Sequence, residues 1–205
     1  MKNYPKKDIT GIIIAGGQSK RMQYVDKGLT KIHGKPMISY VINNLSKQVN
    51  SIIINSNRYI EEYQQLGYRV VADVMDNHQG PLAGIVSALA VVRTPYAMIL
   101  PCDVPCCPTT LGPKLMDALQ HENADICVAH DGHRMQSLIM LLRCSLKSRI
   151  ENYLASGQRK VETWIVNQNY TTVDFSQNNH CFLNVNTPDD LAHLDKLIKR
   201  NENKR

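Results

Sequence analysis

The chain has 205 residues, 43% of them hydrophobic, which suits one α/β domain with a real core rather than two independent domains. Much of its +6 net charge lies near the two ends, where basic residues usually form solvated tails, so we expect residues 1–7 and 200–205 to be flexible and no nucleic acid to bind. Six scattered cysteines do not suit a disulfide scaffold, and no apolar run approaches the roughly 20 residues of a membrane span, so we expect a cytoplasmic protein that binds no membrane.

Strands alternate with helices through the first half of the chain. Apolar runs predict strands at 9–15, 51–56, 68–72 and 96–101, and helical spacing predicts helices at 36–48, 58–66 and 81–92. This alternation is typical of a mostly parallel sheet covered by helices on both faces, so we predict a three-layer, Rossmann-like α/β fold.

The second half of the chain is less regular. We expect a helix at 109–120, strands at 125–129 and 136–142, a helix after Cys144, a helix at 159–167, a strand at 170–175 and a closing helix from Pro188. All of these elements fit within one domain over 1–205.

A glycine-rich loop follows the first predicted strand, within residues 12–27. Gly16 and Gly17 lack a Cβ, so the backbone there can approach a ligand closely, and such loops hold phosphates in α/β proteins. Positive charge for a phosphate comes from Lys20, Arg21 and Lys27. The Gly-Lys-Ser/Thr of a Walker loop and the three spaced glycines of a dinucleotide motif are both missing. We interpret the stretch as a nucleoside-triphosphate loop, with an ordinary glycine turn as the alternative.

Three polar residues stand at the ends of other predicted strands: Asn55, Asp73 and Asp103. The carboxyl ends of parallel strands converge on one crevice, so we expect these side chains to meet the glycine loop. Asp103 suits Mg²⁺, which prefers carboxylates and phosphate oxygens, although a turn aspartate is the alternative. Asn55 and Asp73 suit nucleobase and ribose recognition, and which of them reads the base stays open. Asp26 is either a partner that orients Lys27 or Arg21, or a solvated loop charge.

The glycine-rich stretch resembles the Leu-Ala-Gly-Gly-x-Ser-x-Arg-Met-Gly-x-Asp-Lys signature of nucleotidyltransferases with a glycosyltransferase-A-like fold. Within that group the chain is similar to the bacterial molybdenum cofactor guanylyltransferase family, which moves GMP from GTP onto molybdopterin. The resemblance continues through 80–84, 101–105 and 184–188, and so covers nearly the whole chain. Gln23 departs from the usual glycine, and 134–138 lacks a proline often found there.

The resemblance implies a Mg²⁺-dependent transfer in which GTP and molybdopterin react and pyrophosphate leaves. It implies a GTP-binding half over about 8–105, an acceptor-side half over about 106–200, and further partners among cofactor-biosynthesis proteins and target apoenzymes. The implied GTP site comprises Ile14, Ala15, Gly16, Gly17, Lys27, Asn55, Asp73, Gly80, Gly84 and Asp103. The implied catalytic residues are Arg21, Lys27 and Asp103, with Asp103 as metal ligand, and the implied acceptor residues are Asn184 and Asn186.

Several alternatives remain at this level. The chain could be a transferase of the same fold that uses CTP or a sugar-phosphate acceptor, or a non-catalytic nucleotide-binding protein that delivers a cofactor. Basic and hydrogen-bonding groups beyond the nucleotide strands could hold an anionic acceptor or form a solvated surface: His133, Arg134, Gln136, Ser137, Arg159, Lys160, Asn184 and Asn186.

Overall fold

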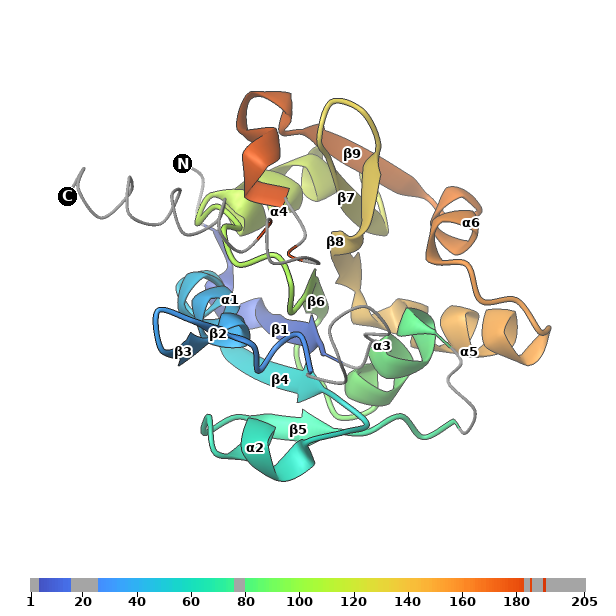
Figure 1. Ribbon diagram of the computed structural model, residues 1–205. Coiled ribbons are helices and arrows are strands. Elements are labelled where there is room, and N and C mark those ends of the chain that lie inside the picture. Colours follow the sequence, from blue (N-terminus) through green and yellow to red (C-terminus); the bar gives the residue numbers. More distant parts are fainter. Residues whose placement is uncertain (1–3, 16–25, 76–79, 183–184, 186–189, 191–205) are drawn as a thin grey trace.

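A single large sheet organises the molecule. The computed structural model describes residues 4–15, 26–75, 80–182, 185 and 190 (Figure 1). In this part of the chain the sheet has seven strands. Their spatial order is β5 (Arg69–Val71), β4 (Ser51–Asn55), β1 (Ile9–Ile14), β6 (Tyr96–Pro101), β8 (Met135–Arg143), β7 (Ile126–His130) and β9 (Tyr170–Asp174).

Strand β1 lies at the centre of the parallel part of the sheet. It pairs in parallel with β4 on one side and β6 on the other, with Ile14 opposite Asn55 and Pro101. These three strands therefore end side by side. Chain connections run outward in both directions from β1, which makes its carboxyl end the switch point where α/β sheets bind ligands.

Strand β8 runs antiparallel to both of its neighbours, β6 and β7. It follows β7 through a tight turn, as antiparallel neighbours allow. In this turn Asp131 Oδ1 accepts the backbone N–H groups of His133 and Arg134, both at 2.8 Å. The first residues of β8 consequently lie at the same edge of the sheet as the carboxyl ends of β6 and β7.

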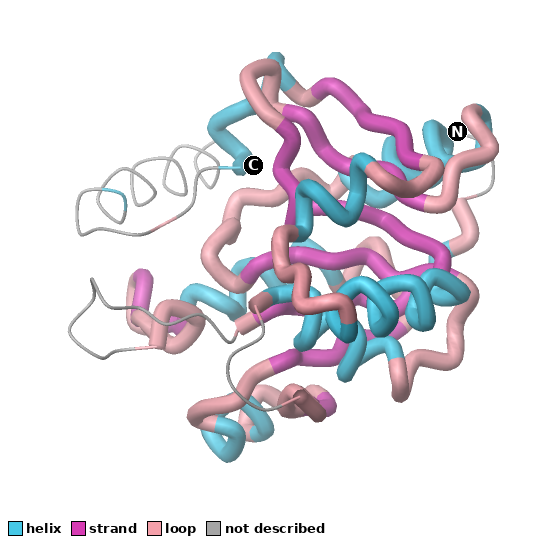
Figure 2. The backbone as a smooth tube through the Cα atoms, turned by 90° about the vertical axis from the view of Figure 1, so that its right-hand side faces the viewer, coloured by secondary structure: helices cyan, strands magenta, loops and turns pink. Residues whose placement is uncertain are grey.

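Helices cover both faces of the sheet (Figures 1 and 2). Alternate residues of β1 belong to two separate core clusters, Ile9 and Ile13 to one and Ile12 and Ile14 to the other. The first cluster includes α1 (Met37–Leu45), α2 (Ile60–Gln64) and α4 (Leu111–His121). The second includes α3 (Pro81–Leu89), α5 (Lys147–Ala155) and α6 (Val161–Val166). The predicted three-layer, mostly parallel α/β fold is thus confirmed.

Some local elements differ from the prediction. A small antiparallel hairpin of β2 (Lys31–Ile32) and β3 (Lys35–Pro36) precedes α1, and two-residue strands carry too little periodicity to be predicted. Short 3₁₀ helices occur at Lys6–Asp8, Cys144–Leu146 and Ser176–Phe182. The closing helix predicted from Pro188 lies outside the described residues. Among the described helices, none has the length and apolar character to cross a bilayer.

Candidate active site

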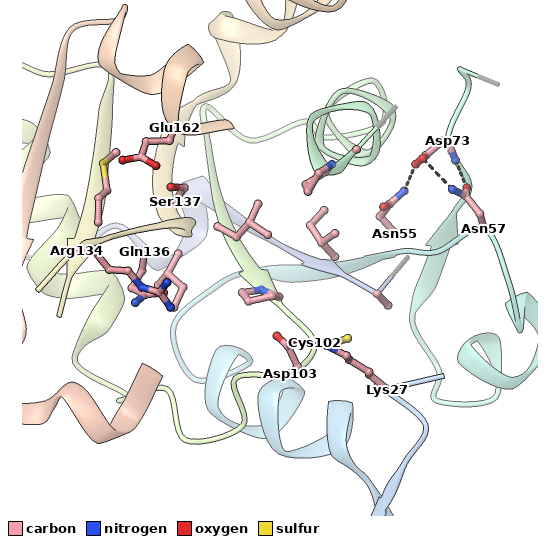
Figure 3. A pocket seen from close by; sticks show the side chains of 18 residues that line it. Lys27, Asn55, Asn57, Asp73, Cys102, Asp103, Arg134, Gln136, Ser137 and Glu162 are labelled. Atoms are coloured by element: carbon pink, nitrogen blue, oxygen red, sulfur yellow. Dashed lines mark hydrogen bonds and ion pairs between the residues drawn. The ribbon is translucent and has the colours of Figure 1, made fainter. Parts of the chain in front are cut away.

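A pocket of about 750 Å³ opens at the carboxyl edge of the parallel strands. Figure 3 shows three groups of side chains along it: Asn55, Asn57 and Asp73 at one end, Lys27, Cys102 and Asp103 in the middle, and Arg134, Gln136, Ser137 and Glu162 at the other end. Further lining residues include Ile14, Ala15, Gly80, Pro81 and Pro101. The pocket therefore joins the strand ends that the sequence predicted with a wall from the second half of the chain.

The first end is a hydrogen-bonded network around the Asp73 carboxylate. Asn55 Nδ2 donates to Asp73 Oδ1 and Asn57 Nδ2 donates to Oδ2, each at 2.8 Å. The backbone N–H of Asp73 in turn donates to Asn57 Oδ1 at 2.7 Å. Asn57 was missed in the sequence, where it looks like one more polar residue of the turn after β4.

Gly80 and Gly84 play different parts in this end of the pocket. Gly80 lines the pocket just before α3 and has a φ of 78°, a left-handed conformation that favours glycine. Gly84 is buried within α3 and, although described, is not a lining residue. A Cβ at Gly84 would lie 2.1 Å from Asn55 Oδ1, so this glycine makes room for Asn55.

An ion pair occupies the middle of the pocket. Lys27 Nζ lies 3.4 Å from Asp103 Oδ2, and the two side chains are 26% and 15% exposed. Desolvation raises the pKa of the Asp103 carboxyl, and the charge of Lys27 opposes that shift. The pair brings together two residues 76 positions apart, as the predicted convergence of strand ends requires.

The Asp103 carboxylate fits a Mg²⁺ site in which the substrate supplies some of the metal ligands. Mg²⁺ commonly takes one or two protein carboxylates and completes its shell with phosphate oxygens and water. The described residues contain no cluster of three or more His, Cys, Asp or Glu side chains that could form a closed metal cage. A metal at Asp103 would therefore need a phosphate ligand from the substrate.

Cys102 also lines the pocket, beside Asp103. Burial raises the pKa of its thiol well above the ordinary value, and the neighbouring Asp103 carboxylate adds to the shift. Because the thiolate is the reactive form of cysteine, this side chain does not suit a nucleophile.

Asp26 is buried, with 8% of its surface exposed, which contradicts the solvated-charge alternative. Its Oδ1 accepts hydrogen bonds from the Tyr63 hydroxyl and, at 3.0 Å, from the backbone N–H of Gly28. Burial raises the pKa of the Asp26 carboxyl despite these bonds. Asp26 thus fixes the backbone next to Lys27 through Tyr63 of α2, a partner that sequence spacing did not reveal.

The far end of the pocket consists of β8 and the first turn of α6. Gln136 Nε2 donates to Asp131 Oδ2 at 2.5 Å, which ties the side chain to the preceding turn. Arg134, Gln136 and Ser137 were predicted on this side, whereas Glu162 was missed because only the tertiary fold brings α6 here. His133, Arg159 and Lys160 are described but do not line the pocket. Arg159 Nη1 instead donates to the backbone oxygen of Leu154 at 2.7 Å.

Five predicted site residues lie outside the described part of the chain: Gly16, Gly17, Arg21, Asn184 and Asn186. Val185, between the two asparagines, is described and buried, and its backbone N–H donates to Asp103 O at 3.1 Å.

Known proteins resemble this chain in sequence and in fold. A molybdenum cofactor guanylyltransferase from Shewanella sediminis is 37% identical over 192 residues, 94% of this chain and 98% of that protein. One from Shewanella amazonensis is 40% identical, over 93% of this chain and 97% of that protein.

Two solved structures share the fold. Molybdopterin-guanine dinucleotide biosynthesis protein A from Archaeoglobus fulgidus superposes with a TM-score of 0.76 at 19% identity, covering 93% of this chain and 99% of that one. The 4-diphosphocytidyl-2C-methyl-D-erythritol synthase from Anaerococcus prevotii gives 0.72 at 14% identity, covering 95% and 99%. The sequence profile of the MobA-like NTP transferase domain matches residues 11–171. The chain therefore belongs to the MobA-like NTP transferase domain family.

Proposed function

We propose that this protein transfers GMP from GTP to the phosphate of molybdopterin, forming a molybdopterin guanine dinucleotide and releasing pyrophosphate. The observation that carries the proposal is the position of the Lys27–Asp103 pair between two polar ends of one pocket. Membership of an NTP transferase family and relatives at about 37% identity support the reaction type.

The residues of this chain act by positioning and by neutralising charge, because phosphoryl-group chemistry asks for little covalent participation by the protein. The Asn55, Asn57 and Asp73 end receives the base and ribose. Lys27, with Arg21, neutralises the charge that builds on the departing pyrophosphate, and the backbone N–H groups of Gly16 and Gly17 bind phosphate oxygens. The acceptor phosphate approaches the α-phosphorus from the opposite end of the pocket.

Asp103 is the residue that would hold Mg²⁺. When bound, the metal supplies charge neutralisation and polarises the α-phosphate. Lys27, 3.4 Å from Asp103, keeps this carboxylate oriented and compensates part of its burial.

Asn184 and Asn186 belong to the acceptor side in this proposal. Replacing both with alanine is expected to raise the KM for molybdopterin and to leave GTP affinity unchanged. If GTP affinity fell while acceptor binding held, this assignment would be wrong.

Pyrophosphate release with molybdopterin, Mg²⁺ and each of GTP, ATP and CTP tests the function. We expect release with GTP and its loss, by about two orders of magnitude or more, in Asp103→Asn, because a metal ligand contributes several kcal/mol to the transition state. Asp117→Asn, on the exposed face of α4, is the matched control and should behave as the wild type. Preferential use of CTP would favour the cytidylyl alternative, and nucleotide binding without release would favour the delivery protein.

A further inference from the structure

Two neighbouring residues, Asp26 and Lys27, send their side chains to different partners. The Lys27 ammonium reaches Asp103 in the middle of the pocket, with Nζ 3.4 Å from Oδ2 (Figure 3). The buried Asp26 carboxylate instead accepts the Tyr63 hydroxyl and the Gly28 backbone N–H, both on Oδ1. The backbone that carries Lys27 is therefore anchored on the side of Asp26, while its ammonium faces the pocket.

Tyr63 is a fully buried residue of α2 whose one polar side-chain atom serves this segment. Its ring packs in the core cluster shared by α1, α2 and α4. A buried hydroxyl needs a hydrogen-bond partner, and Asp26 supplies the acceptor. A Cβ at Gly28 would overlap the Tyr63 hydroxyl, so the backbone after Lys27 packs directly against it. The hydroxyl thus lies against both chain neighbours of Lys27.

The same segment is also held by α1. The backbone N–H of Ile38, in the first turn of that helix, donates to Gly28 O at 2.9 Å. Lys27 therefore extends from a backbone fixed by two helices, by α1 through a main-chain bond and by α2 through the Tyr63 hydroxyl. An ammonium that is aimed in advance loses less conformational freedom when it meets a phosphate, and this saving appears as affinity.

We propose that Tyr63 is a positioning residue for Lys27: through Asp26 it aims the ammonium at the β- and γ-phosphates of the nucleotide. The inference rests on the proposed function, in which Lys27 neutralises the departing pyrophosphate. Tyr63 is described but does not line the pocket. Its contribution to triphosphate binding passes through the segment that carries Lys27.

Isothermal titration of GTP and GMP, with Mg²⁺, into the full chain and its Tyr63→Phe variant tests this role. GMP lacks the β- and γ-phosphates, so the GTP:GMP affinity ratio isolates the contribution of those groups. Tyr63→Phe should weaken GTP by about tenfold and GMP by less than about twofold, because one hydrogen bond to a charged group has this magnitude. In a Lys27→Met background, Tyr63→Phe should change the ratio by less than about twofold, because the residue that it positions is gone.

Gly28→Ala disturbs the same contact from the other side, because the added Cβ overlaps the Tyr63 hydroxyl. It should lower the ratio as Tyr63→Phe does, and it provides the test if Tyr63→Phe does not fold. Tyr4→Phe is the matched control, since it removes a hydroxyl that donates to Gln48 O at 2.7 Å and neither residue lines the pocket. This variant should lose some stability to denaturant and keep the wild-type ratio.

A wild-type ratio near one, or an unchanged ratio in folded Tyr63→Phe or Gly28→Ala, would overturn the role of Tyr63. An equal fall in the Lys27→Met background would overturn it as well, because the effect would not pass through Lys27. A wild-type chain that binds GTP but releases no pyrophosphate with molybdopterin would instead refute the proposed function, and the GTP:GMP ratio would still decide the role of Tyr63.

Discussion

At the scale of single residues, the site depends on glycine positions where the missing side chain leaves room for a neighbouring side chain. Gly84 is the clearest case, since it stands in the middle of a helix where alanine would ordinarily be better by about 1 kcal/mol. The Gly84 Cα hydrogen that a side chain would replace faces Asn55, and Asn55 in turn donates a hydrogen bond to Asp73. The helix thus carries a glycine because the site needs the space.

Gly84→Ala is expected to weaken GTP binding by about tenfold and to destabilise the fold by about 1–3 kcal/mol, because the new Cβ displaces Asn55. Calorimetric titration and chemical denaturation measure the two effects. The double variant Gly84→Ala with Asn55→Ala is the control, since it removes the clash and should recover part of the stability. A stabilised Gly84→Ala variant with unchanged GTP affinity would contradict the close contact.

Asp26 predicts a pH dependence of stability. Burial raises its folded-state pKa above the ordinary 3.8, so between these two values the folded protein holds a proton that the unfolded chain has lost. The free energy of unfolding should therefore fall as pH rises from about 4 through the folded-state pKa. Asn at this position can still accept from Tyr63 and Gly28 but does not titrate.

Denaturation curves collected across this pH range should show a smaller fall for Asp26→Asn than for the wild type. Asp125→Asn is the control, because this half-exposed carboxylate pairs with Arg143 near the other edge of the sheet. An identical fall in wild type and Asp26→Asn would mean that Asp26 does not titrate with a raised pKa.

At the scale of elements, the far wall of the pocket depends on the turn between β7 and β8. Asp131 holds this turn through the N–H groups of His133 and Arg134 and through Gln136 Nε2. Asp131→Ala should raise the KM for the acceptor by about tenfold and leave GTP affinity unchanged, because several hydrogen bonds that orient the wall are lost.

Asp174→Ala serves as the control, as this aspartate accepts the backbone N–H of Ser176 at 2.7 Å at the end of β9 but does not line the pocket. Steady-state kinetics with GTP and acceptor varied separately distinguish the variants. Equal changes for both substrates in Asp131→Ala would argue against a wall that serves the acceptor alone.

The elements show how far sequence reasoning reaches. Apolar runs that alternate with helical segments predicted β1, β4 and β6. Because the carboxyl ends of parallel strands lie at one edge of a sheet, these strands also predicted that Ile14, Asn55 and Asp103 lie close together. The direction of β8 was not predicted, since an apolar run reads the same either way. The Asp131–Gly132 pair between two strands was the available hairpin signal.

Side-chain partnerships were harder to predict than strand ends. Asn57 acts through a residue 16 positions away, and Tyr63 reaches Asp26 across 37. Neither contact has a periodic signature, because each depends on the turns that follow β4 and on the packing of α2. Glu162 likewise reaches the pocket only because α6 packs beside β8.

At the scale of the whole molecule, the sheet in the described part of the chain is parallel except for β8, which lies between β6 and β7. The parallel part brings the ends of β1, β4 and β6 to one switch point. The antiparallel β8 adds its opening residues to the same edge, so the pocket continues past Asp103 toward Glu162. In the proposed function, this one pocket presents the nucleotide and the acceptor to each other on either side of the Lys27–Asp103 pair.

Mass spectrometry of the product tests this central claim most directly. The protein is incubated with Mg²⁺, molybdopterin and an equimolar mixture of GTP, ATP and CTP, and the molecular mass of the acceptor is then measured. Our account predicts that molybdopterin gains one GMP unit, with one pyrophosphate released for each, and that Asp103→Asn forms this product at least about a hundredfold more slowly. A cytidylyl or adenylyl adduct as the main product, or an acceptor left unmodified by folded protein while GTP is bound, would contradict it.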